Sequence, residues 1–122
     1  MKNISQALDD YWLHVITTST EEGQFLELTF RYMPFMEYWT VDVVCEDLNF
    51  ALYGVRLCTL PNLLTGYENK IPFGLGVVTT NDLEAWQVTC FEDGSCRVYL
   101  LNKEECQQIA SGKVDNVEEA FA

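Results

Sequence analysis

The residues of this 122-residue chain that could carry chemistry are its single histidine, its five cysteines and its many acids. A histidine that acts as a catalytic base needs a nucleophile beside it and a group that orients its ring. His14 stands in no such motif, so a strand histidine with a hydrogen bond or solvent contact is the simpler interpretation. A small intracellular enzyme that pairs His14 with a cysteine stays open as the least supported hypothesis.

The sequence contains none of the common cofactor motifs. It has no HExxH, no GxGxxG, no GxxxxGKS/T phosphate loop and no DxDxDG calcium loop. Gly74-Leu75-Gly76 lies within a strand pattern, where such a pair favours a bend or the close approach of another backbone. We therefore expect no catalytic residues, no cofactor, no metal and no enzymatic activity.

The cysteines are expected to be reduced thiols, mostly buried in the core. They are Cys45, Cys58, Cys90, Cys96 and Cys106. Their number is odd and no CxxC pair occurs, whereas zinc sites usually show tight paired spacing. The alternative is a disulfide between Cys90 and Cys96. A two-residue turn at Asp93-Gly94 would point these side chains to opposite faces, which disfavours a bridge.

The charge of the chain narrows the classes of partner. Nineteen acids against seven basic residues give a formal net charge of −12, which argues against binding nucleic acid or anionic lipid. The charge fits a soluble protein, a partner of a basic surface or an acidic mimic of DNA. No stretch approaches the roughly 18 apolar residues of a membrane span, and no signal peptide is visible. We expect the chain to be made and kept in a cytoplasm, unless it leaves as part of an assembly.

A period-two alternation of apolar and polar residues is the strongest structural signal. It predicts a half-buried strand from Gln24 to Tyr32 and a second from Tyr38 to Cys45, joined as a hairpin through Pro34. A strand from Phe50 to Thr59 follows, and Gly54 near its middle indicates a bulge.

The remaining strands are shorter. Further strands are predicted at Trp12–Thr18, Ile71–Thr80, Trp86–Phe91 and Cys96–Leu101, the last two as a hairpin around Asp93-Gly94. The segment from Leu60 to Lys70 is expected to be irregular. Together these elements predict a mainly β fold, a compact antiparallel barrel or sandwich of five to seven strands with a short C-terminal helix.

One domain is expected over residues 1–122. Residues 1–20 would form an N-terminal arm or an extra strand or helix, and residues 102–122 a helix and an acidic tail. Asn102 is suited to cap the helix with Glu105 as its reciprocal partner, and Gly112 to end it. The tail after Gly112 would fray alone, so its order would suggest that something holds it, such as a partner.

A candidate protein interface lies in the connection between the first two strands. Phe35, Met36 and Tyr38 are large and apolar, although turn tips are usually polar. Such residues indicate either a loop folded back onto the core or a contact surface, and the sequence favours neither.

The order of several short motifs resembles a known family. Phe30-Arg31-Tyr32-Met33 leads through a short turn into Trp39-Thr40-Val41-Asp42-Val43, and Gly54-Val55-Arg56-Leu57 and Leu63-Leu64 follow. A glycine-containing strand, Phe73 to Val78, and Arg97-Val98-Tyr99-Leu100 close the series. Over Phe25 to Leu101 this order is similar to that of small phage tail proteins, the baseplate plug proteins of contractile-tailed phages.

The resemblance implies a structural virion protein of the tail baseplate rather than an enzyme. Such proteins sit near the baseplate axis, where tail tube, hub and spike meet, and help to close the tube before infection. The implied partners are hub, tube and spike proteins, and several copies would match the hub symmetry. The alternative from composition is an acidic inhibitor or DNA mimic that binds a basic protein groove, although its acids are scattered evenly along the chain.

Overall fold

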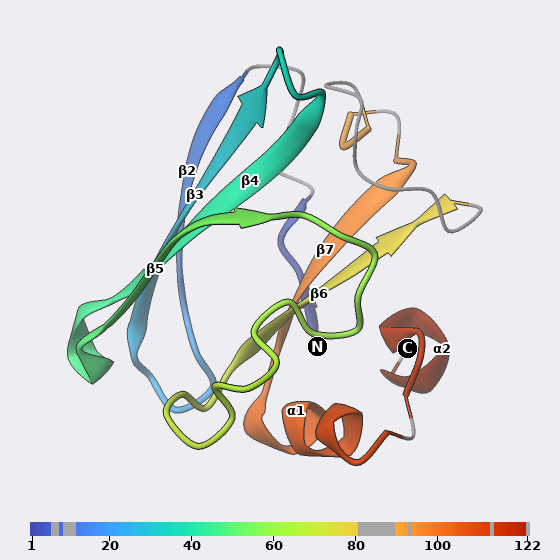
Figure 1. The fold of residues 1–122 in the computed structure, drawn as a ribbon. Coiled ribbons are helices and arrows are strands. Elements are labelled where there is room, and N and C mark those ends of the chain that lie inside the picture. The colour runs from blue at the N-terminus through green and yellow to red at the C-terminus, as the bar shows by residue number, and fades with distance from the viewer. Residues whose placement is uncertain (6–7, 9–11, 81–89, 93, 113, 122) are drawn as a thin grey trace.

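The computed structural model describes residues 1–5, 8, 12–80, 90–92, 94–112 and 114–121. It contains two antiparallel sheets (Figure 1). The four-stranded sheet has the order β2 (Leu13–Ser19), β3 (Phe25–Met33), β4 (Tyr38–Cys45) and β5 (Phe50–Arg56). The three-stranded sheet has the order β1 (Lys2–Asn3), β7 (Cys96–Leu101) and β6 (Gly74–Thr79). A 3-10 helix η2 (Glu46–Leu48) and the helices α1 (Lys103–Ala110) and α2 (Val117–Phe121) complete the described elements.

The two sheets form a sandwich-like β fold, which confirms the predicted class. They are not closed into a barrel within the described residues, so the sandwich is the alternative that holds. Alternation explains the packing, because the inward residues of β3 and β4 are fully buried: Leu26, Leu28, Phe30, Trp39, Val41 and Val43. Trp39 lies at the centre, with its ring edge-on to Phe91 at a centroid distance of 5.0 Å and to Tyr32 at 5.4 Å.

The predicted bulge is present in β5. The register shifts between the pairs Val41–Val55 and Val43–Leu52, and Gly54 has a φ of +69°, which favours glycine. The Gly54 amide donates to Asp42 Oδ1 at 2.8 Å. The strand ends at Arg56 and not at Thr59, because the chain then leaves this sheet and runs along β6.

The segment after β5 covers the outer edge of β6. The Val77 amide donates to the Leu60 carbonyl at 2.9 Å, and the Leu63 amide to the Leu75 carbonyl at 2.7 Å. Asn62 lies between them, buried, with Oδ1 accepting from the amides of Leu64 and Leu75. The irregular segment therefore ties the two sheets together and leaves no open backbone along this part of β6.

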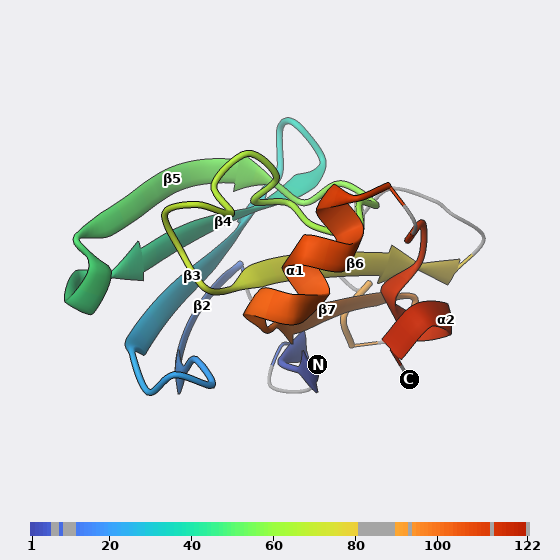
Figure 2. The same ribbon diagram turned by 90° about the horizontal axis from the view of Figure 1, so that it is seen from below.

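The β6 strand is buried along its whole length because it is covered on both faces. Leu75 and Val77 face the other sheet, whereas Gly74, Gly76 and Val78 face α1 and α2 (Figure 2). A Cβ atom added at Gly74 would meet Cys106 Sγ at 2.7 Å, and one at Gly76 would meet the Pro61 carbonyl oxygen at 2.9 Å. The glycine pair thus permits close approach, as its place in a strand predicted.

The predicted last hairpin is only partly described. Residues 86–89 lie outside the described residues, whereas Cys90 and Phe91 form a turn and the Cys96 amide donates to the Cys90 carbonyl at 2.9 Å. The strand neighbours of β7 among the described residues are β1 and β6. No disulfide joins the five cysteines, all of which are described, and four of them are buried while Cys58 is half-buried. The expectation of reduced thiols is therefore confirmed.

The first helix begins and ends as the sequence indicates. Asn102 Oδ1 accepts from the Glu105 amide at 2.8 Å, and Glu105 Oε1 accepts from the Asn102 amide at 3.0 Å, a complete capping box. Ser111 follows the last helical residue, and Gly112 has a φ of +81°.

The acidic tail is held by this chain itself. Glu118 of α2 accepts from Arg97 Nε at 2.6 Å and Nη2 at 3.0 Å, and from the Tyr99 hydroxyl. Val117 beside it is fully buried against β6. The suggestion that a partner orders the tail is therefore unnecessary, because Arg97 and Tyr99 project from the α-helix side of β7 and hold it there.

The contacts of Glu118 with Arg97 and Tyr99 should make the packing of α2 against β6 depend on pH. The hydrogen bond from Arg97 lowers the pKa of Glu118, while burial raises the pKa of Tyr99 to about 12. A carboxyl with a lowered folded pKa stabilises the fold above its unfolded pKa of about 4.3, and this contribution is lost as pH falls through the folded value.

We expect α2 to release from β6 as pH falls below about 4, before the whole chain unfolds. Glu118→Gln should cost about 1 kcal/mol at pH 7, a value discounted for partial exposure, and should remove this pH step. The exposed Glu119→Gln is the matched control and should leave it unchanged. The Val117 methyl signals in NMR spectra report docking, and a pH step that survives in Glu118→Gln would contradict the assignment.

Candidate protein interface

The connection between β3 and β4 is a tight turn at one end of the four-stranded sheet (Figure 1). The Met33 carbonyl accepts from the amides of Met36, at 3.1 Å, and of Glu37, at 2.7 Å. Glu37 has a φ of +57°, which closes the turn before β4 begins. The backbone of the turn is therefore held by its own hydrogen bonds, and its side chains are displayed on a fixed frame.

The structure places Phe35 and Met36 in solvent. Phe35 is 99% exposed and Met36 62% exposed, so this turn does not fold back onto the core. An exposed aromatic ring on a closed turn has the properties of an anchor for a partner, because its burial gains apolar area at little cost in backbone order. We call Phe35 and Met36 the hairpin tip.

Tyr38 is separated from the hairpin tip. It pairs with Met33 across the two strands and is half-buried, with the Arg56 guanidinium carbon 4.7 Å from its ring centroid. It therefore belongs to the outer face of the sheet, where the cation covers its ring. The sequence brought the three residues together by proximity in the chain, but the structure unites only two of them.

Sequence reasoning missed a second exposed apolar region. Leu13 and Val15 are each more than half exposed on the outer face of β2, whereas the exposed Phe25 lies opposite Ser19 at the other end of the strand pair. The signal was present in the chain, since Leu13 and Val15 alternate with His14 and Ile16. It was obscured because apolar residues occupy both faces of this strand, so the alternation does not show which face is outward.

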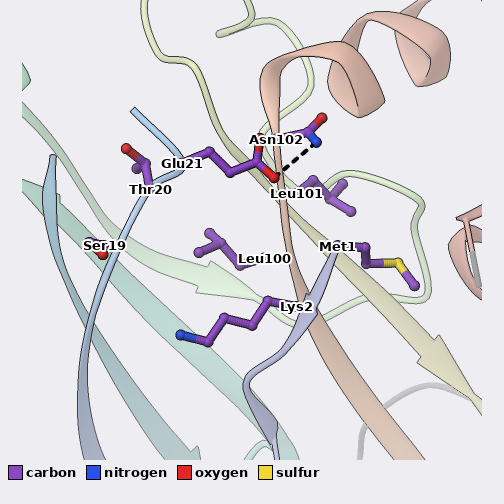
Figure 3. A pocket seen from close by; sticks show the side chains of 8 residues that line it. All are labelled: Met1, Lys2, Ser19, Thr20, Glu21, Leu100, Leu101 and Asn102. Carbon is purple, nitrogen blue, oxygen red and sulfur yellow. Dashed lines mark hydrogen bonds between the residues drawn. The ribbon is translucent and has the colours of Figure 1, made fainter. Parts of the chain in front are cut away.

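A shallow pocket lies where the end of β2 approaches β1 and β7 (Figure 3). It is lined by Met1, Lys2, Ser19, Thr20, Glu21, Leu100, Leu101 and Asn102. Its charged groups are already engaged, because Lys2 Nζ donates to Thr18 Oγ1 at 3.1 Å and Asn102 Nδ2 donates to Glu21 Oε1 at 3.3 Å. Neither a histidine nor a cysteine lines it, so it is not the place where His14 would meet a thiol.

His14 and Cys106 lie on different elements, the strand β2 and the helix α1. His14 lies on β2, and its ring is 6.3 Å from the ring of the core residue Trp39. Burial raises the pKa of the Cys106 thiol to about 12, which keeps it protonated and a poor nucleophile. No group of three or more His, Cys, Asp or Glu residues among those described could hold a metal ion.

Several acids act within the fold. Asp42 accepts from the Gly54 amide and pairs with Arg31, Asp47 accepts from the Phe25 amide at 2.9 Å, and Glu118 binds Arg97. These three acids therefore serve the fold and are not free to imitate the phosphates of a nucleic acid. Among the described residues, no helix has the length and apolar character to cross a membrane.

Comparison with known proteins gives the family of the chain. No curated protein matches the chain. The sequence model of one family, described as cyanophage baseplate Pam3 plug gp18, matches residues 1–103. The matched residues contain both sheets and end at the first residue of α1, and they extend the resemblance noted over Phe25 to Leu101 to the N-terminus. The chain therefore belongs to the family of the cyanophage baseplate Pam3 plug gp18 and is a structural protein of a phage baseplate.

Proposed function

We propose that the protein is a plug-like subunit where tail tube, hub and spike meet, and that it helps to close the tube before infection. The observation that supports this role best is the hairpin tip, an aromatic ring presented almost entirely to solvent on a turn held by its own hydrogen bonds. A plug must bind neighbouring subunits firmly and needs no chemistry of its own. The role we infer is therefore structural and not catalytic.

The partners we propose are hub, tube and spike proteins with a basic surface. The net charge of −12 would accelerate encounter with such a surface, while the hairpin tip would supply the buried anchor. Tyr38 would add to this interface at its edge, since it follows the turn directly and is half-buried rather than buried. The like charge of the copies disfavours direct contact between them, so several copies would be arranged around the axis through the hub.

Phe35→Glu is expected to lower incorporation into baseplates by at least about tenfold, the effect of removing one anchor residue. The fold should persist, because the side chain is exposed and the turn is closed through the Met33 carbonyl. The measurement is the amount of the chain that copurifies with baseplates from a phage carrying the variant gene.

Tyr53→Glu is the matched control, because Tyr53 is another exposed aromatic residue but lies at the bulge of β5, away from the hairpin tip. Both variants should unfold at the wild-type temperature. Normal incorporation of Phe35→Glu, or an equal loss in both variants, would refute the role of the hairpin tip.

A further inference from the structure

Among the described residues, β2 is an edge strand of the four-stranded sheet, with β3 as its neighbour on one side and no strand on the other (Figure 1). The Tyr32 amide donates to the Trp12 carbonyl, and the Thr20 amide to the Gln24 carbonyl, at the two ends of the β2–β3 ladder. In an antiparallel pair these bonds recur at every second residue. The even-numbered residues of β2 therefore bond to β3, and the odd-numbered residues, Leu13, Val15, Thr17 and Ser19, direct their amides and carbonyls away from the sheet.

This edge lacks the features that normally protect an edge strand. Leu13 to Ser19 contains no lysine, arginine, acid or proline, and Leu13 and Val15 are 54% and 59% exposed. Natural edge strands usually carry charges, proline or a bulge, because bare edges pair with other strands. Lys2 reaches the strand only at the Thr18 hydroxyl, an even-numbered residue on the inner face.

The other edges in the described part of the molecule are protected. The β5 edge has the bulge at Gly54, ends in Arg56 and is flanked by Tyr67, whose ring is 5.5 Å from that of Phe50. The β6 edge is covered by the segment around Asn62. β1 is only two residues long. Three edges are thus protected, whereas the long and uncharged β2 is not. This difference indicates that the β2 edge is kept available for a strand of another protein.

Charge indicates which strand would bind there. The acid pair Asp9-Asp10 precedes β2 in the sequence, and the exposed pair Glu21-Glu22 follows it. Pairing of β2 with β2 of a second copy, parallel or antiparallel, would bring acids of one chain beside acids of the other. A strand with an uncharged centre and lysine or arginine at its ends would instead be attracted at both ends.

We propose that the β2 edge is a strand-addition site that binds one extended segment of another baseplate subunit, uncharged in its centre and basic at its ends. Backbone hydrogen bonds to Leu13, Val15, Thr17 and Ser19 give the affinity, and the exposed Leu13 and Val15 side chains add apolar contact. This inference rests on the proposed function, because the partner strand comes from the baseplate.

Hydrogen exchange tests the proposal residue by residue. The isolated chain and assembled baseplates are exchanged in D₂O, quenched, dissociated and read by NMR. We expect the amides of Leu13, Val15, Thr17 and Ser19 to exchange at least about a hundredfold more slowly in the baseplate, since in the isolated chain they point away from β3 and the described residues offer them no acceptor. The amides of His14, Ile16 and Thr18, bonded to β3, are the internal control and should be slow in both samples. Unchanged exchange of the odd-numbered amides in the baseplate would overturn the proposal.

A variant at Val15 tests the same site by assembly. Val15→Pro removes an amide that points away from the sheet and leaves the β2–β3 bonds intact, whereas Val15→Thr keeps the amide and the β-branched shape. We expect Val15→Pro to reduce incorporation into baseplates by at least tenfold and Val15→Thr to leave it unchanged. If Val15→Pro fails to fold, the exchange experiment decides alone.

The remaining outcomes separate the proposal from its premise. Normal incorporation of Val15→Pro would overturn the strand-addition site. Protection of the odd-numbered amides in the isolated chain that grows with its concentration would also overturn it, because a second copy would then be the ligand. Absence of the wild-type chain from purified baseplates would overturn the proposed function itself.

Discussion

Replacing Asn62 with alanine is expected to lower the free energy of unfolding by about 2–4 kcal/mol. The side chain is 2% exposed, and its Oδ1 accepts from the Leu64 amide at 2.9 Å and from the Leu75 amide at 3.2 Å. Alanine leaves both amides buried without an acceptor, and each unsatisfied buried amide costs about 1–3 kcal/mol. Urea unfolding, followed by tryptophan fluorescence, measures the loss.

The matched control is Asn69→Ala, seven residues away in the same loop. Asn69 is exposed, so its loss should change the unfolding free energy by less than about 0.5 kcal/mol. Asn62→Asp keeps a carbonyl oxygen that can accept from both amides when the acid is neutral, so it should be less harmful than alanine at such a pH. Equal stability of Asn62→Ala and Asn69→Ala would contradict the structural role of Asn62.

Asn62 illustrates what could not be predicted from the sequence. The hairpin of β3 and β4 could be predicted because alternating burial is written into neighbouring residues, and β4 has the expected bounds, Tyr38–Cys45. The segment from Leu60 to Lys70 has no such period. It is ordered by Asn62 and by backbone bonds to β6, which depend on residues more than ten positions away.

The tail shows the same limit for electrostatics. The sequence marks Glu118 only as one of nineteen acids, and nothing local distinguishes it from Glu119. Its partner Arg97 is twenty-one residues earlier, on the face of β7 that α2 covers. Long-range pairs of this kind become visible only when the fold packs the helix against the face of the sheet that carries its partner.

The candidate interface could be predicted in part. Phe35 and Met36 stood out because apolar residues are unusual at a turn, but whether the turn folds back depends on the Met33 carbonyl, which closes it away from the core. The open β2 edge escaped sequence reasoning for a different reason. An edge is defined by which strand has a neighbour on one side only, and strand order is a property of the whole sheet.

Gly76→Ala is expected to lower the free energy of unfolding by about 1–3 kcal/mol, because the added methyl group overpacks a layer with no room for it. Its Cβ would lie 2.9 Å from the Pro61 carbonyl oxygen and 3.1 Å from both methyl groups of Val117. The backbone oxygen belongs to the segment that Asn62 holds, so it cannot give way cheaply, whereas Val117 lies on α2 and can move. Urea unfolding measures the total cost.

A double-mutant cycle with Val117→Ala separates the two contacts. Val117 is fully buried, so its truncation alone should also destabilise the chain. If the methyl group at position 76 clashes with Val117, the double variant should be more stable than the sum of the single losses by at least about 0.5 kcal/mol. Strict additivity would assign the cost of Gly76→Ala to the Pro61 carbonyl alone, and a neutral Gly76→Ala would refute the close packing of β6.

The three-stranded sheet and the helix α2 are therefore held at a distance that only glycine permits at position 76. The Arg97–Glu118 ion pair stabilises the same packing of α2 against the sheet.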